Sequence, residues 1–293
     1  MIFSITHQTD YCYDKPVSLS VHRFFLFPRL GPNVSLQSYH LKVNPGGRGN
    51  WLRDEWDNHF YQVYFPDKTD HMEVTLSMLL DRGDTNPFAF LLAPEALHYP
   101  FPADPFSTGV CEPFLRTGLS ADDESPILPW TRQQQFMEQG DTVSVIVAWL
   151  EQFSEKIAYG TRDEPGVQPP ALTLSQGTGS CRDIAVLAAA FLRLKGIPSR
   201  LVTGFLHTPE EEIETDNTDP GSELHAWVDV FLPGAGWRGV DPTNGVFCDH
   251  QYIPLAVGHT LKATHPFQGT YYSDHPVTSR VHTDLQVRLE EDT

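Results

Sequence analysis

The sequence predicts an α+β protein in which an antiparallel β domain precedes a unit that mixes helices and strands. Apolar and polar side chains alternate at period two over roughly the first 90 residues, a pattern typical of half-buried strands. Prolines crowd between residues 94 and 129, and helical periodicity first appears at Val143. A chain of 293 residues also exceeds the usual size of one core. We therefore predict a β-rich domain over 1–92, a Pro-rich linker over 93–135 and a second domain over 136–293.

The alternation in the first domain is clearest over residues 39–43 and 72–78, where every second side chain is apolar. Residues 60–65 are rich in strand-forming side chains, and the polar turn candidate 56–59 precedes them. These short segments predict an antiparallel β domain. None of them shows a catalytic spacing.

Two helices are predicted after the Pro-rich segment. Apolar residues fall on one helical face over 143–157. A second helix fits Cys181 to Lys195, and Ser180 and Asp183 are spaced as a capping box at its start. Cys181 therefore falls in the first turn of this helix.

Strand patterns follow the second helix, over Ser199–Leu206, Glu223–Leu232 and Trp237–Asp241. The Gly-containing turn at 233–236 joins the last two as a hairpin. We expect the helix to deliver its N-terminus to the face of this sheet. A further alternating segment at 281–289 predicts one more strand, which we assign to the second domain.

The charge balance excludes some classes of partner. Lys and Arg number 20 against 38 Asp and Glu, a formal net charge of −18, which opposes binding to nucleic acid and to anionic membranes. The acidic stretch 209–220 is most simply a solvated surface loop. The N-terminal residues lack the features of a signal peptide, and the four cysteines are scattered, so we expect a cytoplasmic protein with free thiols.

Cys181 is a candidate nucleophile because of its place in the predicted helix. A thiol attacks only as thiolate, and the N-terminus of a helix stabilises negative charge. The preceding Gly177-Thr178-Gly179 would let backbone approach a ligand closely. From these features alone, Cys181 can also be a small buried apolar residue.

His225 and Asp241 are candidates for the base and for the group that orients it. A cysteine nucleophile needs both. Alternation within the predicted strand places His225 and Trp227 on one face, and Asp241 ends the next strand across a tight turn, so the two side chains can be neighbours. A structural His and a turn-forming Asp are the alternatives.

Four blocks between roughly Thr173 and Asn244 carry the candidate residues. The blocks are Gly177–Asp183, Leu192–Arg200, His225–Trp237 and Asp241–Asn244. They resemble the transglutaminase-like superfamily, and they occur in the order typical of that family. Less specifically, residues 11–17 resemble the N-terminal domain of bacterial members.

The resemblance implies a papain-like fold, in which a helix that carries Cys packs against an antiparallel sheet that carries His and Asp. It also implies a thiol enzyme with Cys181 as nucleophile, His225 as general base and acid, and Asp241 as the residue that orients His225. For the oxyanion we consider Gln176 and the Cys181 backbone amide. The implied function is that of a cysteine protease or amidase acting on a peptide or protein substrate through a thioester.

Two rival functions stay open at this level: amine transfer by a protein-glutamine gamma-glutamyltransferase, and a catalytically silent module that binds peptides. We expect no cofactor and no metal. The acidic stretch lacks the spacing of a calcium-binding loop, and Cys248-Asp249-His250 lacks paired zinc-ligand spacing. The sequence does not predict the oligomeric state.

Overall fold

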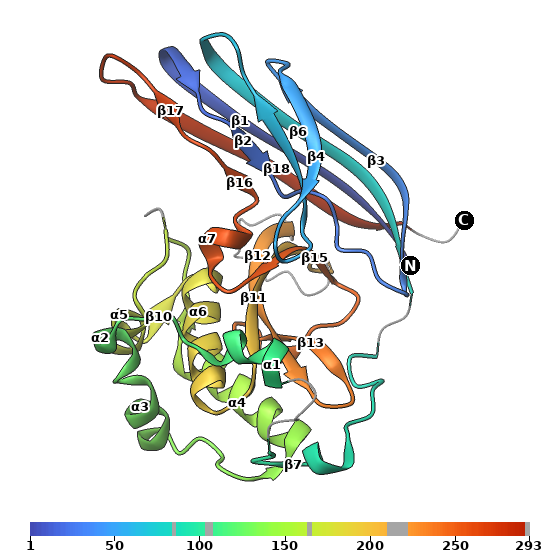
Figure 1. Ribbon diagram of the computed structural model, residues 1–293, viewed down its shortest axis with the longest axis vertical. Coiled ribbons are helices and arrows are strands. Elements are labelled where there is room, and N and C mark those ends of the chain that lie inside the picture. The colour runs from blue at the N-terminus through green and yellow to red at the C-terminus, as the bar shows by residue number, and fades with distance from the viewer. Residues whose placement is uncertain (84–85, 103–107, 163–165, 210–221, 291–293) are drawn as a thin grey trace.

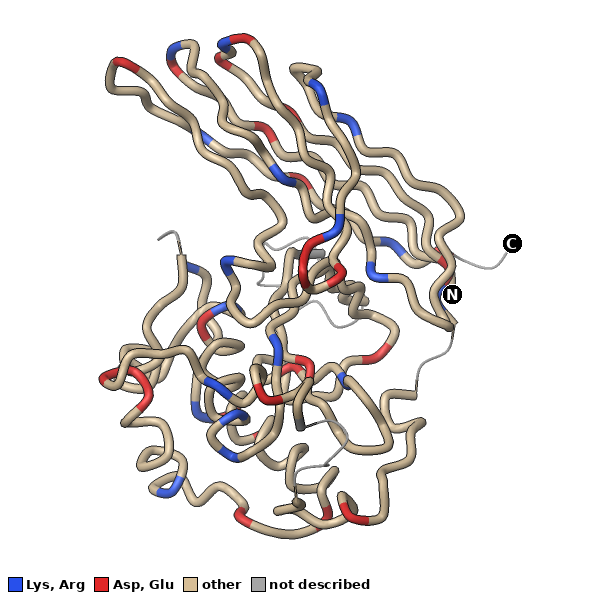
Figure 2. The backbone as a smooth tube through the Cα atoms, viewed as in Figure 1, with Lys and Arg blue, Asp and Glu red and all other residues tan. Residues whose placement is uncertain are grey.

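The computed structural model describes residues 1–83, 86–102, 108–162, 166–209 and 222–290. Figure 1 shows long strands from both ends of the chain as one layer, and most of the helices with a second group of strands at the opposite end. The predicted α+β class with an N-terminal antiparallel β domain is confirmed. Most of the predicted acidic loop at 209–220 lies outside the described residues. Asp and Glu, red in Figure 2, occur on both halves.

The N-terminal sheet is built around β1, which pairs antiparallel with β6 on one side and with β18 on the other. Alternation along β1 buries Phe3 and Ile5 on the face that packs into the core. A smaller sheet with the order β16-β2-β5-β4 lies beside it. The bounds are β1 (Ile2–Leu19), β2 (His22–Phe24), β3 (Val34–Asn44), β4 (Arg48–Arg53), β5 (His59–Tyr64), β6 (Thr69–Arg82), β16 (Phe267–Gln268), β17 (Tyr271–Tyr272) and β18 (Ser279–Glu290).

The last strand corrects the predicted domain division at its C-terminal end. A strand at 281–289 is confirmed as β18, but it pairs along β1 from Ile2↔Glu290 to Tyr13↔Ser279. It therefore completes the N-terminal sheet, and assigning it to the unit 136–293 was wrong. The alternation of a strand indicates which face is buried, and it does not indicate the partner strand. The other predicted boundaries stay predictions.

The described part of the Pro-rich segment forms short helices and packs on both halves. The Tyr99 hydroxyl donates to the carbonyl oxygen of Lys195 at 2.9 Å. Phe114 contacts the rings of Trp56 and Trp237, with centroids 5.5 and 4.9 Å apart. The elements are η1 (Pro94–Ala96), β7 (His98–Tyr99), α1 (Thr108–Cys111), η2 (Glu112–Leu115), α2 (Ala121–Glu124), α3 (Ile127–Gln133) and β8 (Gly140–Asp141). This segment is not a simple extended connection.

The second half packs its helices on a sheet with the strand order β14-β13-β12-β11-β15. Both predicted helices are confirmed as α4 and α6, and the apolar face of α6 contacts β12. The bounds are α4 (Thr142–Lys156), β9 (Ala158–Tyr159), α5 (Pro170–Gln176), β10 (Thr178–Gly179), α6 (Cys181–Leu194), β11 (Ser199–His207), β12 (Ser222–Leu232), β13 (Gly236–Asp241), β14 (Val246–Phe247), β15 (Tyr252–Gly258) and α7 (Leu261–Thr264).

The two halves share a core. Phe205 of β11 and Ile253 of β15 are buried among apolar side chains of the N-terminal sheet. Asn58, within the predicted turn, is fully buried and bonds to both backbone groups of Val257, at 2.7 and 2.9 Å. Within the described part of the chain, no helix combines the length and apolarity needed to cross a bilayer.

Candidate active site

Cys181 is the first residue of α6, as predicted, and it is 7% exposed. The capping box is confirmed: the Ser180 amide and hydroxyl donate to Oδ2 of Asp183 at 2.9 and 2.8 Å. These bonds hold the backbone where the loop enters the helix. The thiol therefore lies at the N-terminal end of a helix, where the first backbone amides of the helix have no intrahelical partner.

Asp183 carries a larger hydrogen-bond network than the sequence predicted. Arg162 donates to it through Nε at 2.8 Å and Nη2 at 3.2 Å, and the Gln168 amide donates at 2.6 Å. The Asp183 side chain is fully buried. Burial alone raises the pKa of Asp183, but the bonds from Arg162, Gln168 and Ser180 together lower it below its ordinary value. This network ties the segment before α5 to the start of α6.

The predicted pair of His225 and Asp241 is formed. Nε2 of His225 lies 2.8 Å from Oδ2 of Asp241, and the two side chains are 1% and 0% exposed. His225 comes from β12 and Asp241 from the end of β13, which are neighbours through the predicted hairpin. A buried carboxylate on Nε2 fixes the tautomer and the orientation of the ring, with the proton on Nε2.

Three further groups hold the Asp241 carboxylate. The Thr243 amide donates to Oδ1 at 2.8 Å, and Asn244 Nδ2 and the Tyr252 hydroxyl donate to Oδ2 at 2.8 and 2.9 Å. Burial alone raises the pKa of Asp241, but the charge and hydrogen bond of His225, with the bonds from Thr243 and Tyr252, lower it overall. Asp241 therefore stays ionised at a buried position that would otherwise favour its protonated, neutral form.

Tyr252 was missed by the sequence reasoning. It lies on β15, at the opposite edge of the sheet from β14, and no local spacing in the sequence indicated that it would contact Asp241. Asn244 did have a signal, since it ends the Asp241–Asn244 block.

The His225 ring is supported by aromatic packing. The Trp227 ring stacks beside it, with centroids 6.3 Å apart and planes 23° apart. Gly204 of β11 lies opposite His225 in the ladder, and a Cβ there would clash with the Ile253 carbonyl and with the Trp227 ring. A glycine at this position therefore lets Trp227 pack closely over β11.

Cys181 and His225 line the same pocket, which has a volume of about 790 Å³. Its wall includes basic side chains, among them Arg182, Lys262 and His265. The described residues that line it include no Asp and no Glu. Apolar walls come from Leu224, Ala226, Leu261 and Phe267. The structure thus brings the three predicted residues together, two in the pocket and Asp241 behind His225.

Gln176 is not brought to this pocket. It is the last residue of α5, exposed, and it is absent from the residues that line the pocket. Of the two predicted oxyanion donors, only the backbone amide of Cys181 belongs to a residue of the pocket. Among the described residues, no three His, Cys, Asp or Glu side chains gather as they would around a metal ion.

Two family models match this chain. Residues 3–81 match the bacterial transglutaminase-like N-terminal region, and residues 131–242 match the transglutaminase-like superfamily. The second match contains all three residues of the predicted triad. The two matches also follow the order of the two halves of the fold.

Similar proteins include an uncharacterized protein from Mycobacterium leprae, 27% identical over 98% of this chain and 96% of that protein. A protein-glutamine gamma-glutamyltransferase from Pseudomonas aeruginosa is 26% identical over 46% of this chain and 20% of that protein. Among solved structures, a candidate cysteine protease from Cytophaga hutchinsonii is similar, with a TM-score of 0.71 at 17% identity, covering 100% of this chain and 92% of that one. This last likeness shows the fold.

Proposed function

We propose that this chain, which belongs to the transglutaminase-like superfamily, is a cysteine hydrolase that cleaves peptide or amide bonds. The observation that supports this most is the buried bond of 2.8 Å between His225 and Asp241, at the wall of a pocket that also contains Cys181. A nucleophile, a base and a group that orients the base are the parts that acyl transfer through a thioester requires.

In the first half of the proposed reaction, Sγ of Cys181 attacks the carbonyl carbon of the substrate. Because Nε2 of His225 bonds to Asp241, Nδ1 is the nitrogen that takes the thiol proton and then gives it to the leaving amine. The C–N bond breaks, and the acyl group remains on sulfur as a thioester. The negative oxygen formed during attack is stabilised by the Cys181 amide at the start of α6.

In the second half, water attacks the thioester. Nδ1 of His225 accepts a proton from the water, the C–S bond breaks, and the proton returns to sulfur as the acid leaves. Throughout both halves Asp241 stabilises the imidazolium form, because its carboxylate is fully buried and ionised next to Nε2. The enzyme ends as it began, with a protonated thiol.

The wall of the pocket supports a peptide substrate with acidic or neutral side chains. Arg182 and Lys262 carry positive charge there, although the whole chain has a formal charge of −18. A carboxylate near the scissile bond would meet opposite charge in this pocket and like charge over much of the remaining surface. A peptide or protein is therefore the proposed partner.

Amine transfer is the rival activity, since the relative from Pseudomonas aeruginosa is a protein-glutamine gamma-glutamyltransferase. Both reactions share the thioester and differ in whether water or an amine attacks it. Water at about 55 M competes with any amine, so a transferase must bind the amine and keep water out. We favour hydrolysis because Arg182 and Lys262 line the pocket and no Asp or Glu occurs among its described lining residues, so the pocket opposes a cationic amine.

The test supplies an acyl-donor peptide together with a primary amine at millimolar concentration, and mass spectrometry follows both products. Hydrolysis predicts mostly free acid, and this product should disappear in Cys181→Ala. Cys12→Ala is the matched control, because Cys12 is an exposed thiol of β1. Mostly amide-linked product would show amine transfer. The silent module would be favoured by two results together: no peptide gives a product, and Cys181 reacts no faster than Cys12 with a thiol probe.

A further inference from the structure

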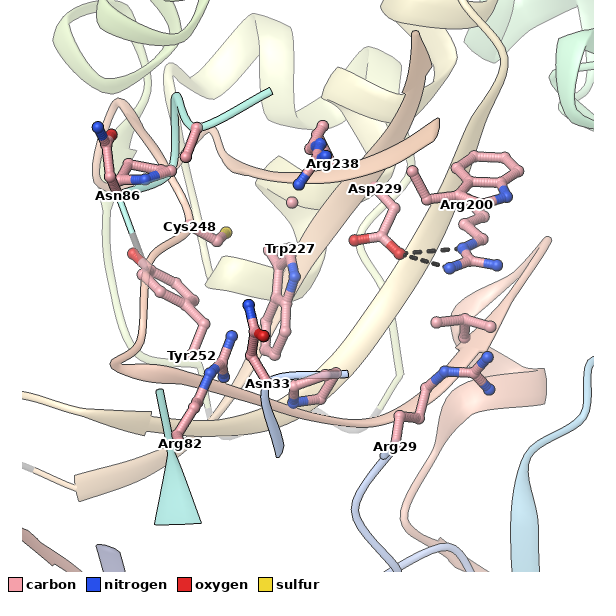
Figure 3. A pocket seen from close by; sticks show the side chains of 16 residues that line it. Arg29, Asn33, Arg82, Asn86, Arg200, Trp227, Asp229, Arg238, Cys248 and Tyr252 are labelled. Carbon is pink, nitrogen blue, oxygen red and sulfur yellow. Dashed lines mark hydrogen bonds and ion pairs between the residues drawn. The ribbon is translucent and has the colours of Figure 1, made fainter. Parts of the chain in front are cut away.

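A second pocket lies behind the His225–Asp241 pair. It has a volume of about 300 Å³, and Trp227 and Tyr252, which contact the pair, form part of its wall. Four arginines line it, from the N-terminal half and from β11 and β13. We call it the arginine pocket, defined by Arg29, Arg82, Arg200 and Arg238. Figure 3 shows these side chains around the hollow.

Two of the four arginines have partners within the protein. Nε and Nη2 of Arg200 lie 3.0 and 2.9 Å from Oδ2 of Asp229, which neutralises that carboxylate. Arg29 donates from Nη1 to the Asn58 side chain at 2.7 Å and to two backbone carbonyls of the same turn. The Arg200 bond therefore joins the neighbouring strands β11 and β12, and the Arg29 bonds lie within the N-terminal half.

The other two arginines, Arg82 and Arg238, have buried N–H groups that lack hydrogen-bond partners in the described part of the chain. There, Nε and Nη1 of Arg82 and Nε of Arg238 are buried and have no hydrogen-bond partner. Arg82 ends β6 and Arg238 lies on β13, and Figure 3 shows them reaching into the pocket from opposite sides. Arg238 also lies over the Phe90 ring, with its guanidinium carbon 4.9 Å from the centroid. Buried guanidinium N–H groups are costly when unpaired, since each has lost its water.

Nearby acidic groups offset this charge only in part, since Asp249, which does not line the pocket, acts against the effect of burial on the pKa of Arg82. Asp229 is already bonded to Arg200. Burial raises the pKa of the Cys248 thiol well above its ordinary value, with Asp241 adding to the effect, so Cys248 is neutral. Burial lowers the pKa of Arg82 and of Arg238, yet a guanidinium stays protonated in proteins. Asn33 adds an amide that can donate.

We propose that the arginine pocket binds a small oxyanion such as phosphate between Arg82 and Arg238. Planar guanidinium groups bind phosphate and sulfate through paired charge-assisted hydrogen bonds, which would satisfy the buried N–H groups. A volume of about 300 Å³ has room for a small anion with its water, and it lies at the lower end of the range for small-molecule pockets. This site is independent of the proposed hydrolysis, since neither arginine lines the pocket of Cys181.

The test titrates the whole chain with inorganic phosphate and with sulfate, against chloride at equal ionic strength so that screening is matched. Binding is measured by calorimetry and by the rise in Tm. The wild type should bind phosphate saturably, and Arg82→Gln and Arg238→Gln should each weaken binding by about 10-fold or more. Arg280→Gln is the matched control, because Arg280 is exposed on β18 and should bind like the wild type.

The Tm of each variant is a second readout, which keeps the test informative if a variant folds poorly. Without added oxyanion, Arg82→Gln should raise the Tm or leave it unchanged, because it removes a guanidinium whose buried Nε and Nη1 have no hydrogen-bond partner among the described residues. At the same phosphate concentration, the wild type and Arg280→Gln should gain more stability than Arg82→Gln or Arg238→Gln. The proposal is overturned if the wild type shows no saturable binding of phosphate or sulfate, or if binding survives both glutamine variants unchanged.

Discussion

Cys181 differs from the other thiols of the chain by its surroundings. It starts α6 and lines the large pocket, whereas Cys12 is exposed on β1 and Cys248 lies in the arginine pocket. Cys181 combines a place at the start of a helix with a pocket that the imidazole of His225 also lines. This combination is what a thiolate nucleophile requires.

Replacing Cys181 by Ala should abolish turnover and leave the fold nearly unchanged. The change removes one sulfur atom from a helix end, so the free energy of unfolding should fall by no more than about 1 kcal/mol. The rate should fall by more than about 10⁵-fold, because no other group can form the thioester. Peptide cleavage and thermal unfolding of the purified variant measure both quantities. Retained cleavage would exclude Cys181 as nucleophile.

Replacing Asp241 by Asn should be damaging but should leave more residual rate than Cys181→Ala. The nucleophile remains, while the orientation of His225 and the stabilisation of its charged form weaken. We expect kcat to fall by roughly 10²–10⁴-fold. Single-turnover kinetics on the folded variant checks this. A total loss equal to that of Cys181→Ala, with an intact fold, would contradict the division of roles.

At the scale of elements, the start of α6 is held by more than its capping box. Ser180 and Asp183 close the box, and Arg162 and the Gln168 amide attach a preceding loop to the same carboxylate. Helix α2 carries a similar pair, Ser120 and Asp123, on the surface. The two Ser–Asp pairs therefore differ in burial and in partners, and of these two pairs the one at α6 forms the full capping box.

This difference predicts unequal costs for the same substitution. Asp183→Asn should lower the free energy of unfolding by about 2–3 kcal/mol, because it removes the charge that bonds to Arg162 inside the protein and weakens the bonds to the Ser180 and Gln168 amides. Asp123→Asn, the control, should cost about 0.5–1 kcal/mol. Chemical denaturation of both variants at pH 7 measures the costs. Equal costs would mean that the Arg162 bond adds nothing.

The same carboxylate predicts a pH dependence. The folded pKa of Asp183 is lowered, so the stability it contributes is complete above its ordinary pKa, near 3.8, and is lost as pH falls through the lower folded value. Asp183→Asn has no such proton to bind. The stability difference between wild type and variant should therefore be constant at neutral pH and shrink below about pH 4. Denaturation series from pH 7 to pH 3 check this, and a difference that grows on acidification would contradict it.

At the scale of the whole molecule, the two halves are joined by sheet pairing and by a shared core. The chain returns after the second half so that β18 covers the edge of β1. Phe205 and Ile253, from strands of the second half, are buried among side chains of the N-terminal sheet. The N-terminal sheet therefore depends on the end of the chain for its edge and on the second half for part of its core.

Two leucines of β18 test this dependence. Leu285 is 6% exposed and Leu289 is 45% exposed on the same strand. Leu285→Ala should lower the free energy of unfolding by about 2–4 kcal/mol, whereas Leu289→Ala should change it by no more than about 0.5 kcal/mol. Thermal and chemical unfolding of the two variants measure this. Equal small effects would mean that β18 contributes little to the core.

The sequence by itself determined the local features of this protein. The capping box at Ser180 and Asp183 is a spacing of three residues, and the neighbouring strands of His225 and Asp241 follow from a short turn. Hydrogen bonds and side-chain periodicity over such distances depend on nearby residues alone. The α+β class, the helix of Cys181 and the meeting of His225 with Asp241 were therefore predictable.

Only the tertiary structure decided which distant segments meet. It placed β18 beside β1, brought the Tyr252 hydroxyl to Asp241, kept Gln176 away from the pocket and gathered Arg82 and Arg238 around one hollow. A strand pattern marks a buried face but does not name the strand or side chain that covers it. That choice depends on the packing of the entire chain, in which burial of apolar surface must be balanced against every polar group that loses water.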